Sequence, residues 1–115
     1  MAEIPENQKS KDEATQTKLG LLLFQLGELA KDPPTTVDLY DWRFNLDHVM
    51  EEIKELAPDY HERLYDLVTA IQAQGEQHVT DIDAEEAPNV IAHSGQIYFE
   101  KVSILNSEIN QLKSL

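Results

Sequence analysis

The sequence of 115 residues predicts an all-α protein, a small antiparallel helical bundle of about four helices. Two observations support this fold class. Apolar residues recur at alternating spacings of three and four, the period of a helix face that packs in a bundle. Proline stands in each break between the periodic segments, at residues 33–34, 58 and 88. The length fits one domain, so we expect a flexible N-terminal tail over residues 1–17 and a helical bundle domain over residues 18–115.

The first helix is expected over residues 18–31, where the apolar content rises abruptly. Five leucines at helical spacing form its buried face: Leu19, Leu22, Leu23, Leu26 and Leu29. Leu21 and Phe24 fall outside this face, so the helix is apolar almost all round and requires cover on more than one side. Gly20 and Gly27 would allow another backbone to approach closely. The prolines at 33–34 end this helix.

The second and third helices are expected over residues 36–57 and 59–74. Thr35 and Thr36 are N-cap candidates, and Asp38 follows Thr35 by three residues, as in a capping box. The apolar seam of the second helix is Leu39, Trp42, Leu46, Val49, Ile53 and Leu56. The third helix carries Tyr60, Leu64, Leu67, Val68 and Ile71 on one face. Pro58 suits its first turn, and Gly75 is a natural residue to end it.

Residues 76–87 are predicted to form an acidic linker, and a fourth helix is expected over residues 88–113. Its heptad seam is Ile91, Gly95, Tyr98, Val102, Leu105, Ile109 and Leu112. A β-hairpin over residues 90–99 is the competing interpretation, because β-forming residues flank a Ser-Gly pair there. The alternation of a strand fails after Gln96 whereas the heptad continues, which favours the helix.

The overall charge excludes some partners. Nine basic and 22 acidic residues give a formal charge of −13, which argues against direct binding of nucleic acid or of an anionic membrane. No apolar run is long enough to cross a bilayer, and no secretory signal is expected. The chain has no cysteine, hence no disulfide and no thiolate metal site. A cytoplasmic location is expected.

The charge is unevenly distributed along the chain. Residues 1–31 carry five acids and four bases, and residues 87–115 carry two of each. Residues 32–86 carry fifteen acids and only three bases, a net charge of −12. The middle segment is therefore either the solvated side of two helices or an acidic surface that meets a basic partner.

The residues predict no enzyme. No phosphate-binding loop, dinucleotide fingerprint, zinc-binding helix motif or nucleophile elbow occurs. A di-iron site is not expected, because no carboxylate stands three residues before any histidine. His48 and Glu52 are interpreted as a solvated surface pair. The acidic linker is a weaker candidate for a divalent-metal site, with possible ligands at His78, Asp81, Asp83, Glu85 and Glu86. We predict no catalytic residue, no metal ligand and no cofactor.

The favoured function is a non-enzymatic interaction module, that is, an adaptor, assembly factor or regulator that binds another protein with a basic surface. The predicted partner-binding residues are Asp38, Tyr40, Asp41, Phe44, Asp47, Glu51 and Glu55. The alternative is a DNA-mimic inhibitor of a nucleic-acid-binding protein, because Asp47, Glu51 and Glu55 stack like charges along one helix line. A divalent-metal-dependent enzyme is the weaker alternative.

Two further apolar lines lie outside the predicted core. They comprise Val37, Tyr40 and Phe44 on the second helix, and Val90, Ile97 and Ile104 on the fourth. The favoured interpretation packs these lines on the first helix; otherwise they form an exposed patch that marks a partner or dimer surface. Because two of the four helices require burial on both sides, we expect a homodimer.

Overall fold

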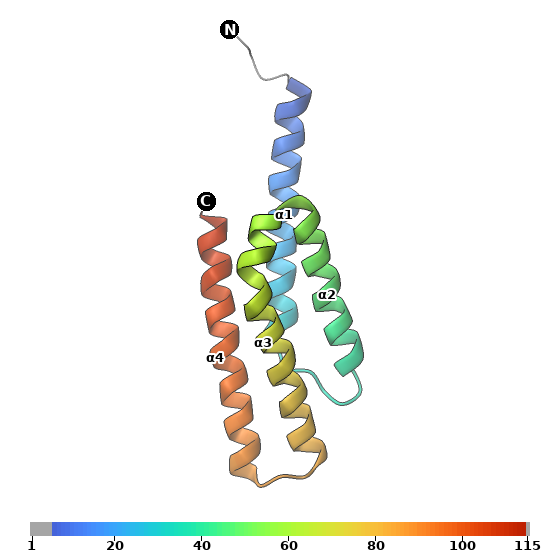
Figure 1. Cartoon of the computed structure of the whole chain (residues 1–115), viewed down its shortest axis with the longest axis vertical. Coiled ribbons are helices and arrows are strands. Elements are labelled where there is room, and N and C mark those ends of the chain that lie inside the picture. Colours follow the sequence, from blue (N-terminus) through green and yellow to red (C-terminus); the bar gives the residue numbers. More distant parts are fainter. Residues whose placement is uncertain (1–5, 115) are drawn as a thin grey trace.

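The computed structural model describes residues 6–114, with side chains from Glu13 to Ser114. Within this range the chain forms four helices: α1 (Glu6–Lys31), α2 (Leu39–Leu56), α3 (Pro58–Asp83) and α4 (Pro88–Lys113). Successive helices run in opposite directions, so the described residues form the predicted antiparallel bundle (Figure 1). Each helix packs on two others, in the cyclic order α1, α2, α3, α4. No described helix is both long and apolar enough to cross a membrane.

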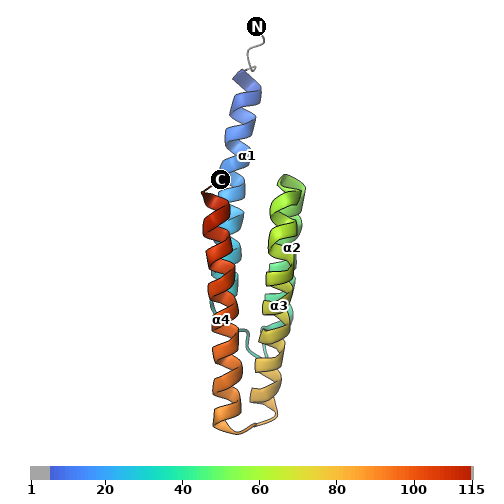
Figure 2. The same cartoon turned by 60° about the vertical axis from the view of Figure 1, so that its left-hand side comes forward.

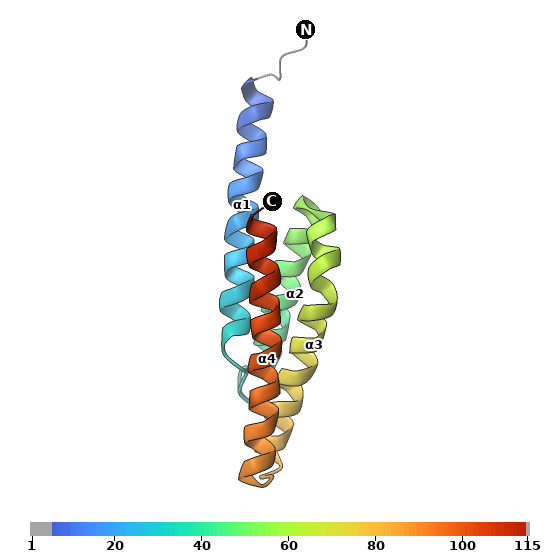
Figure 3. The same ribbon diagram turned by 90° about the vertical axis from the view of Figure 1, so that its left-hand side faces the viewer.

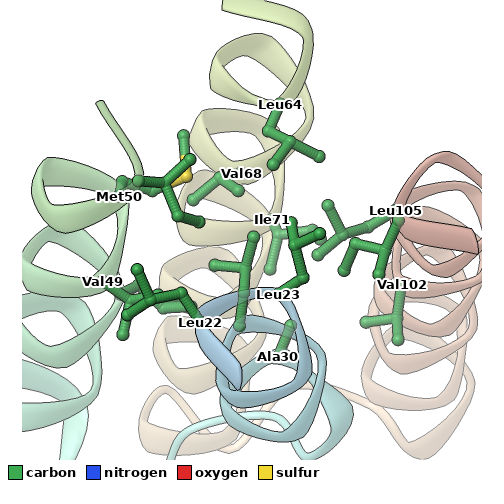
Figure 4. Close-up of a cluster of buried hydrophobic side chains, with 14 of the residues drawn as sticks. Leu22, Leu23, Ala30, Val49, Met50, Leu64, Val68, Ile71, Val102 and Leu105 are labelled. Atoms are coloured by element: carbon green, nitrogen blue, oxygen red, sulfur yellow. The ribbon is translucent and has the colours of Figure 1, made fainter. Parts of the chain in front are cut away.

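The core follows the predicted seams. Residues at the heptad positions of all four helices meet on the bundle axis (Figure 4). The fully buried side chains with the largest volumes are Tyr98, Leu23, Leu26, Leu46, Ile53, Leu64, Ile71, Leu105 and Leu112. The predicted seam of α4 is buried from Tyr98 to Leu112, whereas Ile91 and Gly95 at its start are half-buried. The β-hairpin alternative is excluded because residues 90–99 are helical.

Helix α1 begins earlier than the sequence predicts. Its backbone is helical from Glu6, whereas the prediction placed a flexible tail over residues 1–17; residues 1–5 lie outside the described part of the chain. Residues 6–18 have no apolar period, but they contain no glycine or proline and are rich in Glu, Gln and Lys, which favour helix. Because extension of an existing helix adds a hydrogen bond per residue, the packed half of α1 supports this extension. The extension reaches past the other helices at the end of the bundle where α4 terminates (Figure 3).

The connection into α2 is a turn held by its own side chains. The backbone N–H of Thr35 donates to Asp38 Oδ1 at 2.6 Å, and the N–H of Asp38 lies 3.4 Å from the Thr35 hydroxyl. This reciprocal pattern is that of a capping box, as the spacing predicted, but it precedes the helix. Helix α2 consequently begins at Leu39, three residues after the predicted start.

Helix α3 continues through Gly75, so the predicted linker over residues 76–87 is wrong. Residues 76–83 are helical, and the loop that follows is only Ala84–Ala87. Gly75 does not end the helix, because it is the contact point of α3 with the start of α2. A Cβ atom there would stand 2.5 Å from Trp42 Cη2 and 3.0 Å from Pro34 Cδ. The apolar seam continues beyond Gly75 to the buried Val79.

The extended α3 pairs with α4 through polar contacts. His78 Nδ1 lies 2.8 Å from the Ser94 hydroxyl, and the Gln74 amide donates to the Ser94 carbonyl oxygen at 3.0 Å. The Ser94 hydroxyl also donates to the Ile91 carbonyl oxygen, so the imidazole must supply the proton of its own contact. His78 is thereby directed into the α3–α4 interface. The described residues contain no group of three or more side chains that could hold a metal ion.

Tyr98 ties the middle of α4 to the end of α1. Its hydroxyl donates to the carbonyl oxygens of Ala30 (2.7 Å) and Asp32 (3.1 Å), and its ring lies 6.3 Å from that of Trp42. Burial, together with the nearby Asp32 carboxylate, raises the pKa of the Tyr98 phenol far above its ordinary value.

We expect Tyr98→Phe to lower the free energy of unfolding by about 1–3 kcal/mol, because the buried Ala30 carbonyl and the partly buried Asp32 carbonyl lose their donor. The effect should depend on pH. The folded pKa is raised, so the stabilisation by Tyr98 is complete below the unfolded-state pKa of about 10 and declines at higher pH, where the unfolded phenol ionises. Urea unfolding of wild type and variant can be measured at a series of pH values from neutral to alkaline. The difference between their unfolding free energies should narrow above about pH 10. A constant difference would contradict this role.

Candidate partner-binding surface on helices α2 and α3

The outer side of α2 carries a continuous stripe of exposed residues. Tyr40, Phe44, Asp47, Glu51 and Glu55 follow one another at spacings of four, three, four and four. These spacings keep them on one line of the helix, opposite the buried seam that contains Leu46 and Ile53. Two more predicted site residues, Asp38 and Asp41, are exposed at the start of the helix. All seven predicted binding residues are exposed.

The aromatic members of this stripe are not packed on α1, as the favoured interpretation required. The exposed fractions are 80% for Tyr40 and 59% for Phe44, and Val37 in the preceding turn is also exposed. Phe44 stacks on His48 one turn later, with ring centroids 6.3 Å apart and an interplanar angle of 8°. The correction has a geometric cause: α2 packs its buried seam on α1 and α3, and Tyr40 and Phe44 lie on the opposite side of the helix.

Side chains of α3 fix the position of the stripe. The Gln72 amide donates to Asp47 Oδ1 at 2.8 Å, and the Arg43 guanidinium pairs with the Glu76 carboxylate at 3.0 Å. Both contacts are exposed, so each contributes little to stability. They link α2 to α3 beside the stripe, and the Gln72 contact orients the Asp47 carboxylate.

A groove of about 250 Å³ runs between α2 and α3 beside the stripe. Met50 and Val68, both buried, form its floor. Its polar lining comprises Asp47, Glu51, His61, Tyr65, Thr69 and Gln72. The rings of His61 and Tyr65 lie 5.6 Å apart at a tilt of 40°. The groove thus combines carboxylates, an aromatic pair and an apolar floor.

The four helices differ sharply in charge. Helices α2 and α3 together contain eleven acids and three bases, whereas α1 has four of each and α4 two of each. Figures 2 and 3 show α2 with α3 on one side of the bundle and α1 with α4 on the other. Arg43 is paired with Glu76, and Arg63 donates to Glu108 on α4 at 2.7 Å. We call the exposed stripe of α2 and the adjoining groove the acidic face; its charge is concentrated by the folding of α2 on α3.

Two carboxylates of the acidic face have no partner within the described part of the chain. Glu51 and Glu55 make no hydrogen bond or ion pair with other described residues, so their carboxylates are available to a cationic partner. His48 lies 3.7 Å from Glu52 at the surface, as the sequence suggested. The contributions of His61, Tyr65 and Gln72 were not predicted, because helical period alone does not show which side of α3 meets α2. No protein family, curated protein or solved structure matches this chain.

Proposed function

We propose that this protein is a non-enzymatic interaction module that binds a partner protein with a basic surface. The supporting observation is the acidic face, where exposed carboxylates and aromatic rings share one helix line on the charged side of an otherwise neutral bundle. Interfaces are enriched in Tyr and Phe, and charged groups around them guide association. The module would act as an adaptor, assembly factor or regulator in the cytoplasm.

The groove beside the stripe suits a lysine or arginine side chain of the partner. The aliphatic stem of such a side chain would lie on Met50 and Val68, which favour apolar contact. Its cationic head would reach the carboxylates of Asp47 and Glu51 on the rim. A basic helix or loop that presents cations one turn apart would meet the three acids of the stripe together.

The proposal is tested by the triple variant Asp47→Asn, Glu51→Gln, Glu55→Gln. Proteins retained from a native lysate on the immobilised wild type would be identified, and their association rates measured at several salt concentrations. We expect the variant to associate more slowly, with a flatter salt dependence, because screening weakens attraction beyond about 8 Å at physiological ionic strength. The bundle should retain its stability or gain slightly, since like-charge pairs four residues apart cost about 0.2–0.5 kcal/mol each.

The matched control is Glu85→Gln, Glu86→Gln, Glu100→Gln, which changes the net charge equally outside the acidic face. A partner that binds through this face is retained by the control variant and lost from the triple variant. Equal association rates and salt slopes for both variants would show that the acidic face is only solvated surface, and the proposal would lose its main support.

A second candidate is a DNA-mimic inhibitor, favoured by the spacing of the acids. Asp47, Glu51 and Glu55 lie one turn apart, about 6 Å along the helix, and Glu51 and Glu55 make no ion pair with any described residue. A mimic would occupy the nucleic-acid groove of its partner. The same set of proteins distinguishes the candidates: DNA should displace the wild type from a mimicked partner, whereas DNA has no effect on an ordinary adaptor complex.

A further inference from the structure

Helix α1 exposes an apolar pair on the side opposite its core. Leu19, Leu22, Leu23 and Leu26 are buried, whereas Leu21 is 59% and Phe24 56% exposed. Phe24 borders both the groove toward α2 and the groove toward α4, so it stands on the outer ridge of the helix. Thr17, Leu21, Phe24 and Glu28 follow at spacings of four, three and four, which is a seam for a further helix.

The ends of this outer seam carry opposite charges. Lys18 adjoins the Thr17 end, and Glu28 forms the other end. Both side chains are exposed, and neither makes a hydrogen bond or ion pair with the described residues. The seam therefore runs from a cation, through two apolar residues, to an anion.

A seam with opposite charges at its two ends is complementary to the same seam of a second copy that runs in the opposite direction. In an antiparallel pair of α1 helices, Leu21 faces Phe24 of the second copy, and Lys18 comes within reach of Glu28 of the second copy. In a parallel pair, each charge would face its like, which destabilises association. We propose that two copies of this chain associate through the outer seam of α1, with the two α1 helices antiparallel about a twofold axis between Leu21 and Phe24.

The charge distribution selects a second copy as the occupant of this seam. Two chains of charge −13 repel each other, and the repulsion is greatest where α2 and α3 face each other. Helices α1 and α4 are each neutral, so approach through this side keeps the two acidic faces apart and exposed. Isologous pairing also doubles each complementary contact. The proposal uses a different face and does not depend on the proposed function.

The test measures mass by light scattering across micromolar concentrations at physiological salt. We expect the wild type to approach twice the chain mass of 13.1 kDa. Phe24→Gln should move the mass to that of the monomer. Ile104→Gln is the matched control, because Ile104 on α4 has the same exposed fraction of 56% but lies outside the seam; it should leave the dimer intact. Circular dichroism should show that both variants remain folded, because both positions are exposed.

Charge reversal tests the antiparallel orientation. Lys18→Glu and Glu28→Lys should each weaken the dimer, because each places like charges together at both ends of the seam. The double variant restores opposite charges in an antiparallel pair and should recover the dimer. A wild type that stays monomeric, loss of the dimer in Ile104→Gln, no loss in Phe24→Gln, or no recovery in the double variant would each overturn the proposal.

Discussion

Gly75→Ala should destabilise the bundle, whereas Gly20→Ala should stabilise it. Both glycines lie inside helices, where alanine is intrinsically favoured by about 1 kcal/mol. An added Cβ at Gly20 meets no atom within 4 Å, whereas at Gly75 it would lie 2.5 Å from Trp42 Cη2. The indole cannot move away easily, because Trp42 Nε1 donates to the Leu29 carbonyl oxygen at 3.2 Å. Pro34 Cδ would also lie only 3.0 Å from the added Cβ.

The expected net effects have opposite signs. Overpacking costs about 1–3 kcal/mol, which exceeds the helical gain at Gly75, so the two variants should differ by about 2 kcal/mol in unfolding free energy. Urea unfolding monitored by circular dichroism measures both. Trp42 fluorescence should change for Gly75→Ala and stay constant for Gly20→Ala. Equal stabilisation of the two variants would show that the α2–α3 contact at Gly75 can rearrange around an added Cβ without loss of stability.

The sequence predicts the fold class because its core is periodic. The seams of α2 and α4 read as heptads, and residues such as Leu46 and Leu105 are fully buried where the period places them. Pro58 and Pro88 occupy the first turns of α3 and α4, where proline costs no helical hydrogen bond. These signals are local, so a single sequence contains them.

Helix ends that depend on distant residues could not be predicted. A glycine in an acidic stretch is an ordinary C-terminal signal, but Gly75 serves a close approach to Trp42, far away in sequence. The extension of α1 before Leu19 depends on the packed remainder of the helix, which a local count of apolar residues does not register.

The residues that α2 contributes to the candidate site could be predicted from the sequence, whereas those that α3 contributes could not. Period alone places Tyr40, Phe44 and the acids on one line opposite the seam, whereas the exposure of the two rings appears only in the folded chain. The groove depends on the register between the two helices, which brings Gln72 within hydrogen-bond distance of Asp47. A glutamine gives no sequence signal of such a partner, so the α3 wall of the groove appears only in the folded chain.

Truncation of the exposed aromatics should have the largest effect on partner binding. Tyr40 and Phe44 lie on the same line as Asp47 and Glu51 but carry no charge. Large rings that become buried in an interface are frequent hot spots, worth about 2 kcal/mol or more each. For a partner recovered through the acidic face, we expect Tyr40→Ala and Phe44→Ala to speed dissociation by about 30-fold or more, with little change in association rate.

The salt dependence separates the two kinds of residue in the stripe. Removal of carboxylates should act on association and flatten its salt slope, whereas loss of the rings should leave that slope unchanged. Phe99→Ala is the matched control, because Phe99 is a half-exposed ring on the neutral α4; its dissociation rate should equal that of wild type. The melting temperatures should remain close to wild type, since neither Tyr40 nor Phe44 belongs to the buried core. If Phe99→Ala speeds dissociation as much as Phe44→Ala does, the partner does not bind specifically through Tyr40 and Phe44, and the prediction is wrong.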